Sequence, residues 1–317
     1  MKTILRTFVG CTAILFGTAC MGAVKYVPEN MKVELSLKVP GNNAVNYKLH
    51  PDKLENSYFD YEWRSDNKLP ITVFHKVEER DSCMRLTVQL TAAQDVYFNY
   101  RQLLSTGYRH DNCQFYMPGF WYRRNLRSPK KAPSFHTSDS WLVREDRLSA
   151  PLTGIFSEKE KRFMTVNRLD DFSMDALATH KEGEIILSGK TSLGFTGFEN
   201  QQGIAMLSFG FPYREAPKSY IRKLTLAPEV EAFQLMKKGE SVLLTWEIME
   251  SGADDFSDFI QHTWEHCYDT YAPKPVENSY SIADMKQVLS CFFVNSLVDN
   301  QPLVYNSGIH LKESECE

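Results

Sequence analysis

Short runs in which apolar and polar residues alternate follow one another through residues 32–250. In residues 84–90, apolar Met84, Leu86, Val88 and Leu90 alternate with polar Arg85, Thr87 and Gln89. Further runs occupy residues 33–39, 71–77, 184–187, 204–209 and 242–248. Because turn residues separate these runs, they predict antiparallel strands with one buried and one solvated face.

Strands of this kind bury their apolar faces by packing as two sheets. The strand-rich region is longer than an immunoglobulin-type domain of about 100 residues. We therefore predict a mainly β fold, a large antiparallel β-sandwich over residues 24–250.

The pattern changes at residue 251, after which apolar residues recur at three- and four-residue intervals. The first stripe, which ends before Pro273, is Phe256, Phe259, Ile260, Trp264, Cys267, Tyr268 and Tyr271. A second helix begins after Ser281, with Asp284 as its capping-box partner. Its stripe is Ile282, Met285, Val288, Leu289, Phe292 and Phe293. Two successive amphipathic helices predict an α-helical hairpin. We therefore expect residues 251–317 to form a linker helix and an incomplete helical domain, because the rest of the helical domain that would cover their apolar surface is missing.

The first residues resemble a secretory signal peptide, assigned to residues 1–22. Lys2 and Arg6 precede an apolar run, residues 8–16, that is shorter than the roughly 20 residues a membrane span needs. Small residues then lead to Cys20, a candidate lipidation site. The alternative is cleavage near Ala19 or Ala23. We expect a periplasmic protein or one at the outer membrane or surface of a Gram-negative cell, touching the membrane only through such an anchor.

Net charge and cysteine content limit which ligands the protein can bind and which metal or disulfide sites it can form. Removing the signal takes the formal charge from −4 to −6, which argues against nucleic acid. A disulfide between Cys83 and Cys113 and a set of buried free thiols both remain open. The absence of a Cys-x-x-Cys pair argues against a structural zinc site.

One aromatic and basic segment, residues 113–147, is the main candidate for binding. Its seven Lys and Arg residues face three acids. Aromatic rings suit the apolar faces of sugars, and planar arginine forks pair with carboxylates. The candidate substrate-binding residues are Trp121, Tyr122, Arg123, Arg124, Asn125, His136, Asp139, Trp141, Arg144, Glu145 and Arg147.

The same residues also allow a purely structural interpretation. Trp121 and Trp141 would then belong to the core, and Arg144 and Arg147 would pair with neighbouring acids. Turn residues around the segment mark long loops, where binding groups concentrate. The best candidates for catalytic acids are Asp139, Glu145 and Asp146. The stronger interpretation, however, is that these acids pair with neighbouring arginines.

A second pattern, His262-x-x-Glu265-His266, matches the order of inverted zinc proteases. Only Glu277, Glu313 or Glu315 could serve as a later third ligand. We interpret the pattern as polar residues of an exposed helix, and we predict neither a metal nor a cofactor. The sequence contains no nucleophile elbow, phosphate-binding loop or dinucleotide-binding turn.

Several stretches resemble secreted polysaccharide-degrading proteins of gut-type bacteria, in which a β-sandwich precedes an α/α toroid, the six-hairpin glycosidase-like arrangement. They are residues 118–125 (PGFWYRRN), 132–141 (APSFHTSDSW), 143–147 (VREDR) and 295–300 (NSLVDN). The resemblance implies that sandwich loops border a sugar cleft whose catalytic acids come mostly from the toroid. Since this chain ends near the first helical hairpin, we expect a truncated, catalytically incomplete relative.

The expected function is therefore that of the sandwich portion of a glycoside hydrolase-like or polysaccharide lyase-like protein. Its expected partner is an acidic oligosaccharide or polysaccharide. The alternatives are a non-catalytic glycan-binding surface module and an inactive gene fragment.

Overall fold

The computed structural model describes residues 27–80, 83–128, 132–171, 183–217, 219–222, 225–227, 229–274 and 280–296. The predicted signal peptide with Cys20 lies outside the described residues. So do the acids considered as third metal ligands, Glu277, Glu313 and Glu315. No helix among the described residues is both long and apolar enough to cross a membrane.

One antiparallel sheet is built around the long strand β6 (Val96–Arg109). Its order is β2 (Val45–Lys53), β1 (Met31–Lys38), β6, β14 (Ile204–Phe211), β13 (Phe195–Gln201) and β9 (Trp141–Arg144). Strand β18 (Val230–Met236) also pairs with β6, through the segment nearer the start of β6. We call this the first sheet.

The second sheet is also antiparallel. Its order is β2, β3 (Tyr61–Arg64), β4 (Ile71–Glu79), β5 (Cys83–Ala92), β19 (Ser241–Gly252), β11 (Arg162–Arg168), β10 (Leu152–Ser157), β7 (Cys113–Met117) and β8 (Trp121–Arg123). Strand β2 contributes to both sheets, pairing with β1 up to Leu49 and with β3 from His50.

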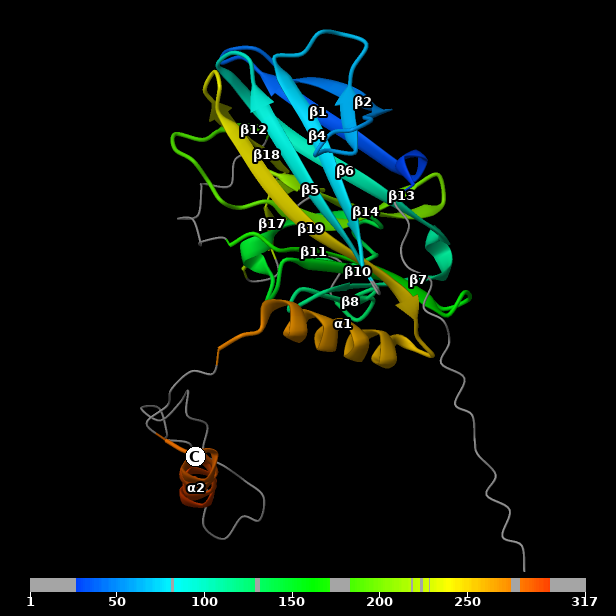
Figure 1. The fold of residues 1–317 in the computed structure, drawn as a ribbon. Helices are drawn as coiled ribbons and strands as arrows, with labels where there is room; N and C mark the ends of the chain where they lie inside the picture. Colours follow the sequence, from blue (N-terminus) through cyan, green and yellow to red (C-terminus); the bar gives the residue numbers. More distant parts are fainter. Residues whose placement is uncertain are drawn as a thin grey trace, which may run out of the picture. The chain divides into compact units, whose positions relative to one another are not determined.

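Shorter elements complete the sandwich. Strand β12 (Gly183–Ile186) pairs with β18 in parallel, β15 (Arg214–Glu215) pairs with it antiparallel, and β16 (Ser219–Arg222) forms a hairpin with β17 (Thr225–Ala227). Single 3-10 turns are η1 (Pro28–Asn30), η2 (His110–Asn112) and η3 (Glu145–Arg147). The predicted mainly β, antiparallel fold is confirmed (Figure 1).

The inner faces of the two sheets meet in an aromatic core. The Trp246 ring of β19 lies 6.3 Å from the Tyr100 ring of β6 and 5.1 Å from the Phe209 ring of β14. Strand β5 shows the predicted alternation, with Leu86 and Val88 fully buried and the residues between them partly exposed. Alternate burial follows because successive strand side chains point to opposite faces.

Helix α1 (Phe256–Tyr271) packs against the outer face of the second sheet, beside β10 (Figure 1). The Phe259 ring lies 5.9 Å from that of Phe156 and 4.9 Å from that of Phe163. Gly154 makes room for it, since a Cβ there would lie 2.5 Å from Cζ of Phe259. The apolar stripe predicted for this helix therefore packs partly on the sandwich, whereas Trp264 remains exposed.

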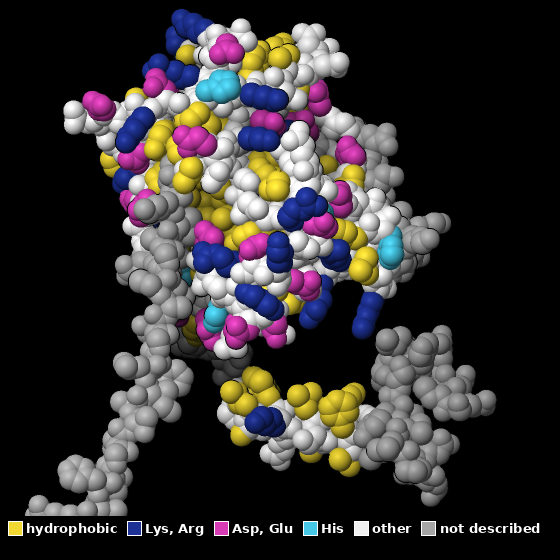
Figure 2. Space-filling view, turned by 90° about the vertical axis from the view of Figure 1, so that its right-hand side faces the viewer, with side chains coloured by type: hydrophobic (Ala, Val, Ile, Leu, Met, Phe, Trp, Pro, Cys, Tyr) yellow, Lys and Arg dark blue, Asp and Glu magenta, His cyan; other side chains and the backbone are white. Residues whose placement is uncertain are grey.

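The chain divides into two compact units between Cys267 and Tyr268. Helix α2 (Ile282–Asn295) belongs to the second unit and begins with the predicted capping box of Ser281 and Asp284. None of its residues is buried, and hydrophobic side chains gather along it (Figure 2). The predicted second helix is thus confirmed.

The described cysteines do not form a disulfide. Cys83, Cys113 and Cys267 are buried free thiols, and Cys291 is exposed. The alternative of a disulfide between Cys83 and Cys113 is wrong. These two residues lie on strands β5 and β7, which do not pair with each other.

Candidate functional site

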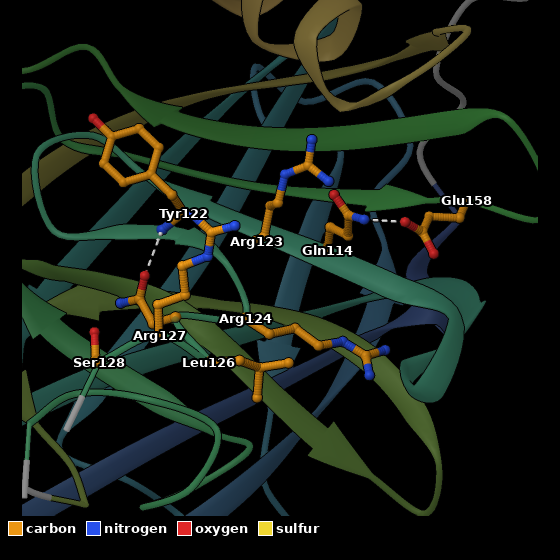
Figure 3. A pocket seen from close by; sticks show the side chains of 9 residues that line it. Gln114, Tyr122, Arg123, Arg124, Leu126, Arg127, Ser128 and Glu158 are labelled. Carbon is orange, nitrogen blue, oxygen red and sulfur yellow. Dashed lines mark hydrogen bonds between the residues drawn. The ribbon is translucent and has the colours of Figure 1, made fainter. Parts of the chain in front are cut away.

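A concave site of about 950 Å³ lies where β7, β8 and the loop after β8 meet the turn between β10 and β11. We call it the arginine cavity. It is lined by Gln114, Tyr122, Arg123, Arg124, Asn125, Leu126, Arg127, Ser128 and Glu158 (Figure 3).

The loop after β8 owes its shape to Asn125. Its side-chain oxygen accepts a hydrogen bond from the backbone N–H of Tyr122 at 3.1 Å, and its amide nitrogen donates to the carbonyls of Phe120 and Pro133. The backbone of Arg123 and that of Asn125 are left-handed, with φ of 57° and 48°. Asn tolerates this region because its short polar side chain bonds locally, so Asn125 stabilises the turn.

A second segment, residues 132–137, supports the loop through hydrogen bonds. The N–H of Phe135 donates to the carbonyl of Arg124 at 3.2 Å. Nε2 of His136 lies 3.1 Å from the carbonyl oxygen of Leu126. His136 therefore positions the loop and does not line the cavity.

The three arginines of the cavity differ in their hydrogen bonds and in their exposure to solvent. Arg124 donates from Nε to the carbonyl of Cys113 at 3.1 Å, and its guanidinium lies 5.2 Å from the Phe135 ring. Arg123 and Arg127 are exposed, with the Arg123 guanidinium 5.0 Å from the ring of Phe256 in α1. Arg124 is thus held by hydrogen bonds, whereas the side chains of Arg123 and Arg127 are accessible to a ligand from solvent.

The cavity carries net positive charge. Within the part of the chain that the structure describes, no carboxylate forms an ion pair with Arg123, Arg124 or Arg127. Glu158 is the acid in the lining, and the Gln114 amide donates to it (Figure 3). Unpaired arginines in a concave site favour an anionic ligand.

Two predicted aromatic platforms are not at the surface. Trp121 and Trp141 are both 0% exposed, with ring centroids 5.4 Å apart. Their indole N–H groups donate to the carbonyls of Arg123 and Ser138. A side chain without exposed surface cannot stack on a sugar, so the prediction of binding by these two residues is wrong. Tyr122, in contrast, is 50% exposed at the cavity.

Arg144 and Glu145 are likewise buried and do not line the cavity. Arg144 forms a two-bond ion pair with Asp146, at 2.6 and 2.7 Å. Glu145 accepts hydrogen bonds from Nη1 of Arg168 and the N–H of Gly194, each at 2.7 Å. Burial raises the pKa of Glu145, while the charge of Arg168 opposes that rise. These partnerships exclude both residues from direct glycan contact.

The remaining candidates are also engaged elsewhere. Arg147 forms an ion pair with Glu215. Asp139 is exposed but accepts from the side chain of Asn200 at 2.7 Å. Of the predicted site residues, the structure brings Tyr122, Arg123, Arg124 and Asn125 together at the cavity.

Five lining residues were not among the predicted site residues. Leu126, Arg127 and Ser128 directly follow Asn125, so extending the basic run would have included them. Gln114 begins the aromatic stretch but has no distinguishing chemistry. Glu158 comes from another strand connection, and only the pairing of β10 with β7 brings it near Gln114.

The two histidines of the H-x-x-E-H pattern have different partners. Nε2 of His262 lies 3.4 Å from the carboxylate of Asp258, one turn earlier in α1. Nε2 of His266 lies 2.8 Å from Oε1 of Glu247 in β19. Since Glu247 is buried, His266 is part of the interface between α1 and the sheet, and the interpretation as a merely exposed polar residue is wrong for it.

No family model and no curated protein matches this sequence. Solved structures with some likeness include a polysaccharide lyase, with 14% identity and a TM-score of 0.33 over 74% of this chain and 27% of that chain. The Slr1438 protein of Synechocystis sp. PCC 6803 has 7% identity and a TM-score of 0.35, over 68% and 73% of the two chains. A human-microbiome protein described as a kojibiose phosphorylase has 7% identity and a TM-score of 0.29, over 83% and 27%.

The neighbours thus include two carbohydrate-active proteins, of which this chain spans 27% of the length. The TM-scores of all three neighbours are well below 0.5, so these likenesses do not identify a function for this chain.

Proposed function

We propose that the protein binds an acidic saccharide in the arginine cavity. The observation that carries this proposal is that Arg123, Arg124 and Arg127 surround one concave site without ion-pair partners among the described carboxylates. A guanidinium presents parallel N–H groups that match a carboxylate. The uronate groups of an acidic glycan supply such carboxylates at intervals along the chain.

The other lining residues suit a sugar ring. The exposed ring of Tyr122 offers an apolar face with a hydroxyl at its edge, the combination that sugar rings complement. The side chain of Leu126 adds apolar surface. The volume, about 950 Å³, lies at the upper end of the roughly 300–1,000 Å³ typical of small-molecule sites and leaves room for more than one sugar unit.

We propose binding at this cavity without cleavage. Glycoside hydrolysis generally uses two carboxyl groups roughly 5 to 9.5 Å apart. The lining includes one acid, Glu158, and the Gln114 amide already donates to it. The non-catalytic glycan-binding module is therefore the better supported alternative. We also propose that residues 1–22 act as a signal peptide that directs export of the chain.

Calorimetric titration with oligogalacturonate tests the proposal, because the same oligosaccharide with its carboxylates reduced to alcohols is a matched neutral ligand. We expect binding of the acidic form alone, weakening as salt rises. Arg127→Ala and Arg123→Ala should each weaken binding at least about tenfold, since a hydrogen bond to a charged group contributes about 1.5–3 kcal/mol.

The control is Arg64→Ala, which removes an exposed arginine of β3 that pairs with Asp52 and Glu62. It should leave the affinity unchanged. Equal affinity for the reduced oligosaccharide, or equal losses in all three variants, would refute the assignment of an anionic ligand to the cavity.

A further inference from the structure

A mixed cluster of sulfur, oxygen and nitrogen ligands lies under α1, apart from the arginine cavity. It consists of Cys83 of β5, Glu247 of β19 and His266 of α1. One ligand atom from each residue lies within 4.8 Å of the other two. Cys83 and Glu247 are 5% and 3% exposed, so two of the three groups are withdrawn from water.

The strand register explains how the cluster forms. Cys83 lies opposite Met249, and Glu247 lies opposite Arg85, so Cys83 and Glu247 are diagonal neighbours on one face. Met84 and Ile248, which alternate with them, point into the core. The diagonal pair therefore faces outward, where α1 crosses the sheet and contributes His266.

The carboxylate of Glu247 is held from both sides. Its Oε1 lies 2.8 Å from Nε2 of His266, and its Oε2 accepts from Nη2 of Arg85 at 3.4 Å. Arg85 thus orients the carboxylate through one oxygen and leaves the other directed at the imidazole. Hydrogen bonds of this kind to the second oxygen commonly orient metal-binding carboxylates.

We propose that Cys83, Glu247 and His266 form a binding site for a transition metal ion, with Zn²⁺ the best match to the ligand set. Zinc binds thiolate sulfur at about 2.3 Å and imidazole or carboxylate atoms at about 2.0–2.2 Å. Tetrahedral ligands at those lengths lie roughly 3.3–3.8 Å apart. The observed cluster reaches that arrangement with small side-chain movements, and a water molecule would complete the tetrahedron.

Binding exchanges protons for the metal ion. The Cys83 thiol releases its proton and binds as thiolate, and His266 binds through Nε2 with its proton on Nδ1. Burial and the nearby Glu247 raise the pKa of the Cys83 thiol to about 11. A coordinated metal ion reverses that effect, because its charge stabilises the thiolate. Metal uptake should therefore release protons and strengthen as pH rises.

Only one half of the H-x-x-E-H pattern takes part in this site. His266 is a ligand, whereas His262 pairs with Asp258 and is absent from the cluster. The other ligands come from two strands, so the metal would tie α1 to β5 and β19. His262→Gln is consequently a matched control on the same helix.

Cobalt titration of the full chain, stripped with chelator and reduced, tests the site. Thiolate-bound Co²⁺ gives a ligand-to-metal absorption band in the near ultraviolet, and Zn²⁺ should displace it. We expect one Co²⁺ per chain in the wild type and in the controls His262→Gln and Cys291→Ser. Cys83→Ser should abolish the band, and His266→Gln should weaken binding at least about tenfold. A wild type without the band, or a band that survives Cys83→Ser, would overturn the proposal.

X-ray absorption of the zinc-loaded wild type gives a second measurement that does not depend on how the variants fold. We expect one sulfur at about 2.3 Å, with nitrogen or oxygen atoms in the remaining positions. A shell with no sulfur, or with two, would also overturn the assignment.

Discussion

The indole nitrogen of Trp121 donates a hydrogen bond to the carbonyl oxygen of Arg123, 3.0 Å away. One residue is fully buried and the other is exposed at the arginine cavity. The bond therefore links the core of the sandwich directly to the backbone of a binding loop. Because Arg123 has left-handed backbone, this support stabilises a conformation that L-residues rarely adopt.

Trp121→Phe should lower both stability and glycan affinity. The substitution keeps most of the apolar volume but leaves the Arg123 carbonyl without its indole partner. We expect a loss of about 1–3 kcal/mol in the free energy of unfolding. Urea unfolding and calorimetry measure the two effects. Trp63→Phe is the control, because the buried indole N–H of Trp63 has no hydrogen-bond partner among the described residues. It should cost less, and equal costs would contradict the role given to the indole of Trp121.

Gly154→Ala should disturb the packing of α1 on the second sheet. A Cβ at this position would lie 2.5 Å from Cζ of Phe259 and 3.1 Å from Cγ2 of Thr165. Overpacking of this kind typically costs about 1–3 kcal/mol. Thermal unfolding should show the loss, and adding Phe259→Leu should recover part of it. Gly189→Ala is the control, since nothing lies within 4 Å of its Cβ position.

His75 should make stability depend on pH. Its ring is buried, Nε2 lies 2.9 Å from the Tyr100 hydroxyl, and desolvation lowers its pKa to about 3. The unfolded chain, with a His pKa of about 6.5, binds more protons between these values. Stability from this residue is thus present above pH 6.5 and decreases as pH falls toward 3, by up to about 1.4 kcal/mol per pH unit.

The check is urea unfolding at several pH values for wild type and His75→Phe. The variant should show a shallower acid-side slope, because it lacks the titrating group. His50→Gln, at an exposed position of β2, should keep the wild-type slope. Identical slopes for wild type and His75→Phe would contradict the assignment.

Arg168→Met should destabilise the fold strongly. The substitution leaves the buried carboxylate of Glu145 without its ion-pair partner, a change that typically costs about 3–5 kcal/mol. Adding Glu145→Gln removes the uncompensated charge and should restore part of the stability. Chemical unfolding of both single variants and the double variant gives the coupling energy. Additive losses would show that the pair is not coupled.

Thiol labelling should separate the cysteines by burial. Burial raises the pKa of the Cys113 and Cys267 thiols to about 12, so both should react slowly in the folded, metal-free chain. Cys291 is exposed and should react fast. Mass spectrometry of labelled peptides assigns the sites. Rapid labelling of Cys113 in folded protein would contradict its buried position in β7.

Local patterns in the sequence were sufficient to predict much of the secondary structure. The alternation in residues 84–90 predicts strand β5 and its buried face correctly, because strand side chains alternate whatever the strand packs against. The Ser281 and Asp284 capping box is correct for a similar reason, since both its hydrogen bonds form within one helical turn.

The sequence and the structure agree only in part on which residues share a surface. Four residues of the basic run, Tyr122, Arg123, Arg124 and Asn125, line the arginine cavity, because they are consecutive in β8 and the loop after it. Trp121, one residue earlier, points to the other face of the short strand β8 and into the core. A strand of three residues offers too little alternation for the sequence to distinguish these two faces.

Local sequence pattern was enough to predict several of the strands and both helices, and to show that arginines and aromatic residues concentrate in one stretch. The tertiary structure alone decided which of those side chains reach solvent. It also joined Glu158 to Gln114, and Cys83 to Glu247 and His266. The physical reason is that periodicity depends on near neighbours in the chain, whereas burial and ligand geometry depend on sheet pairing between residues far apart in sequence.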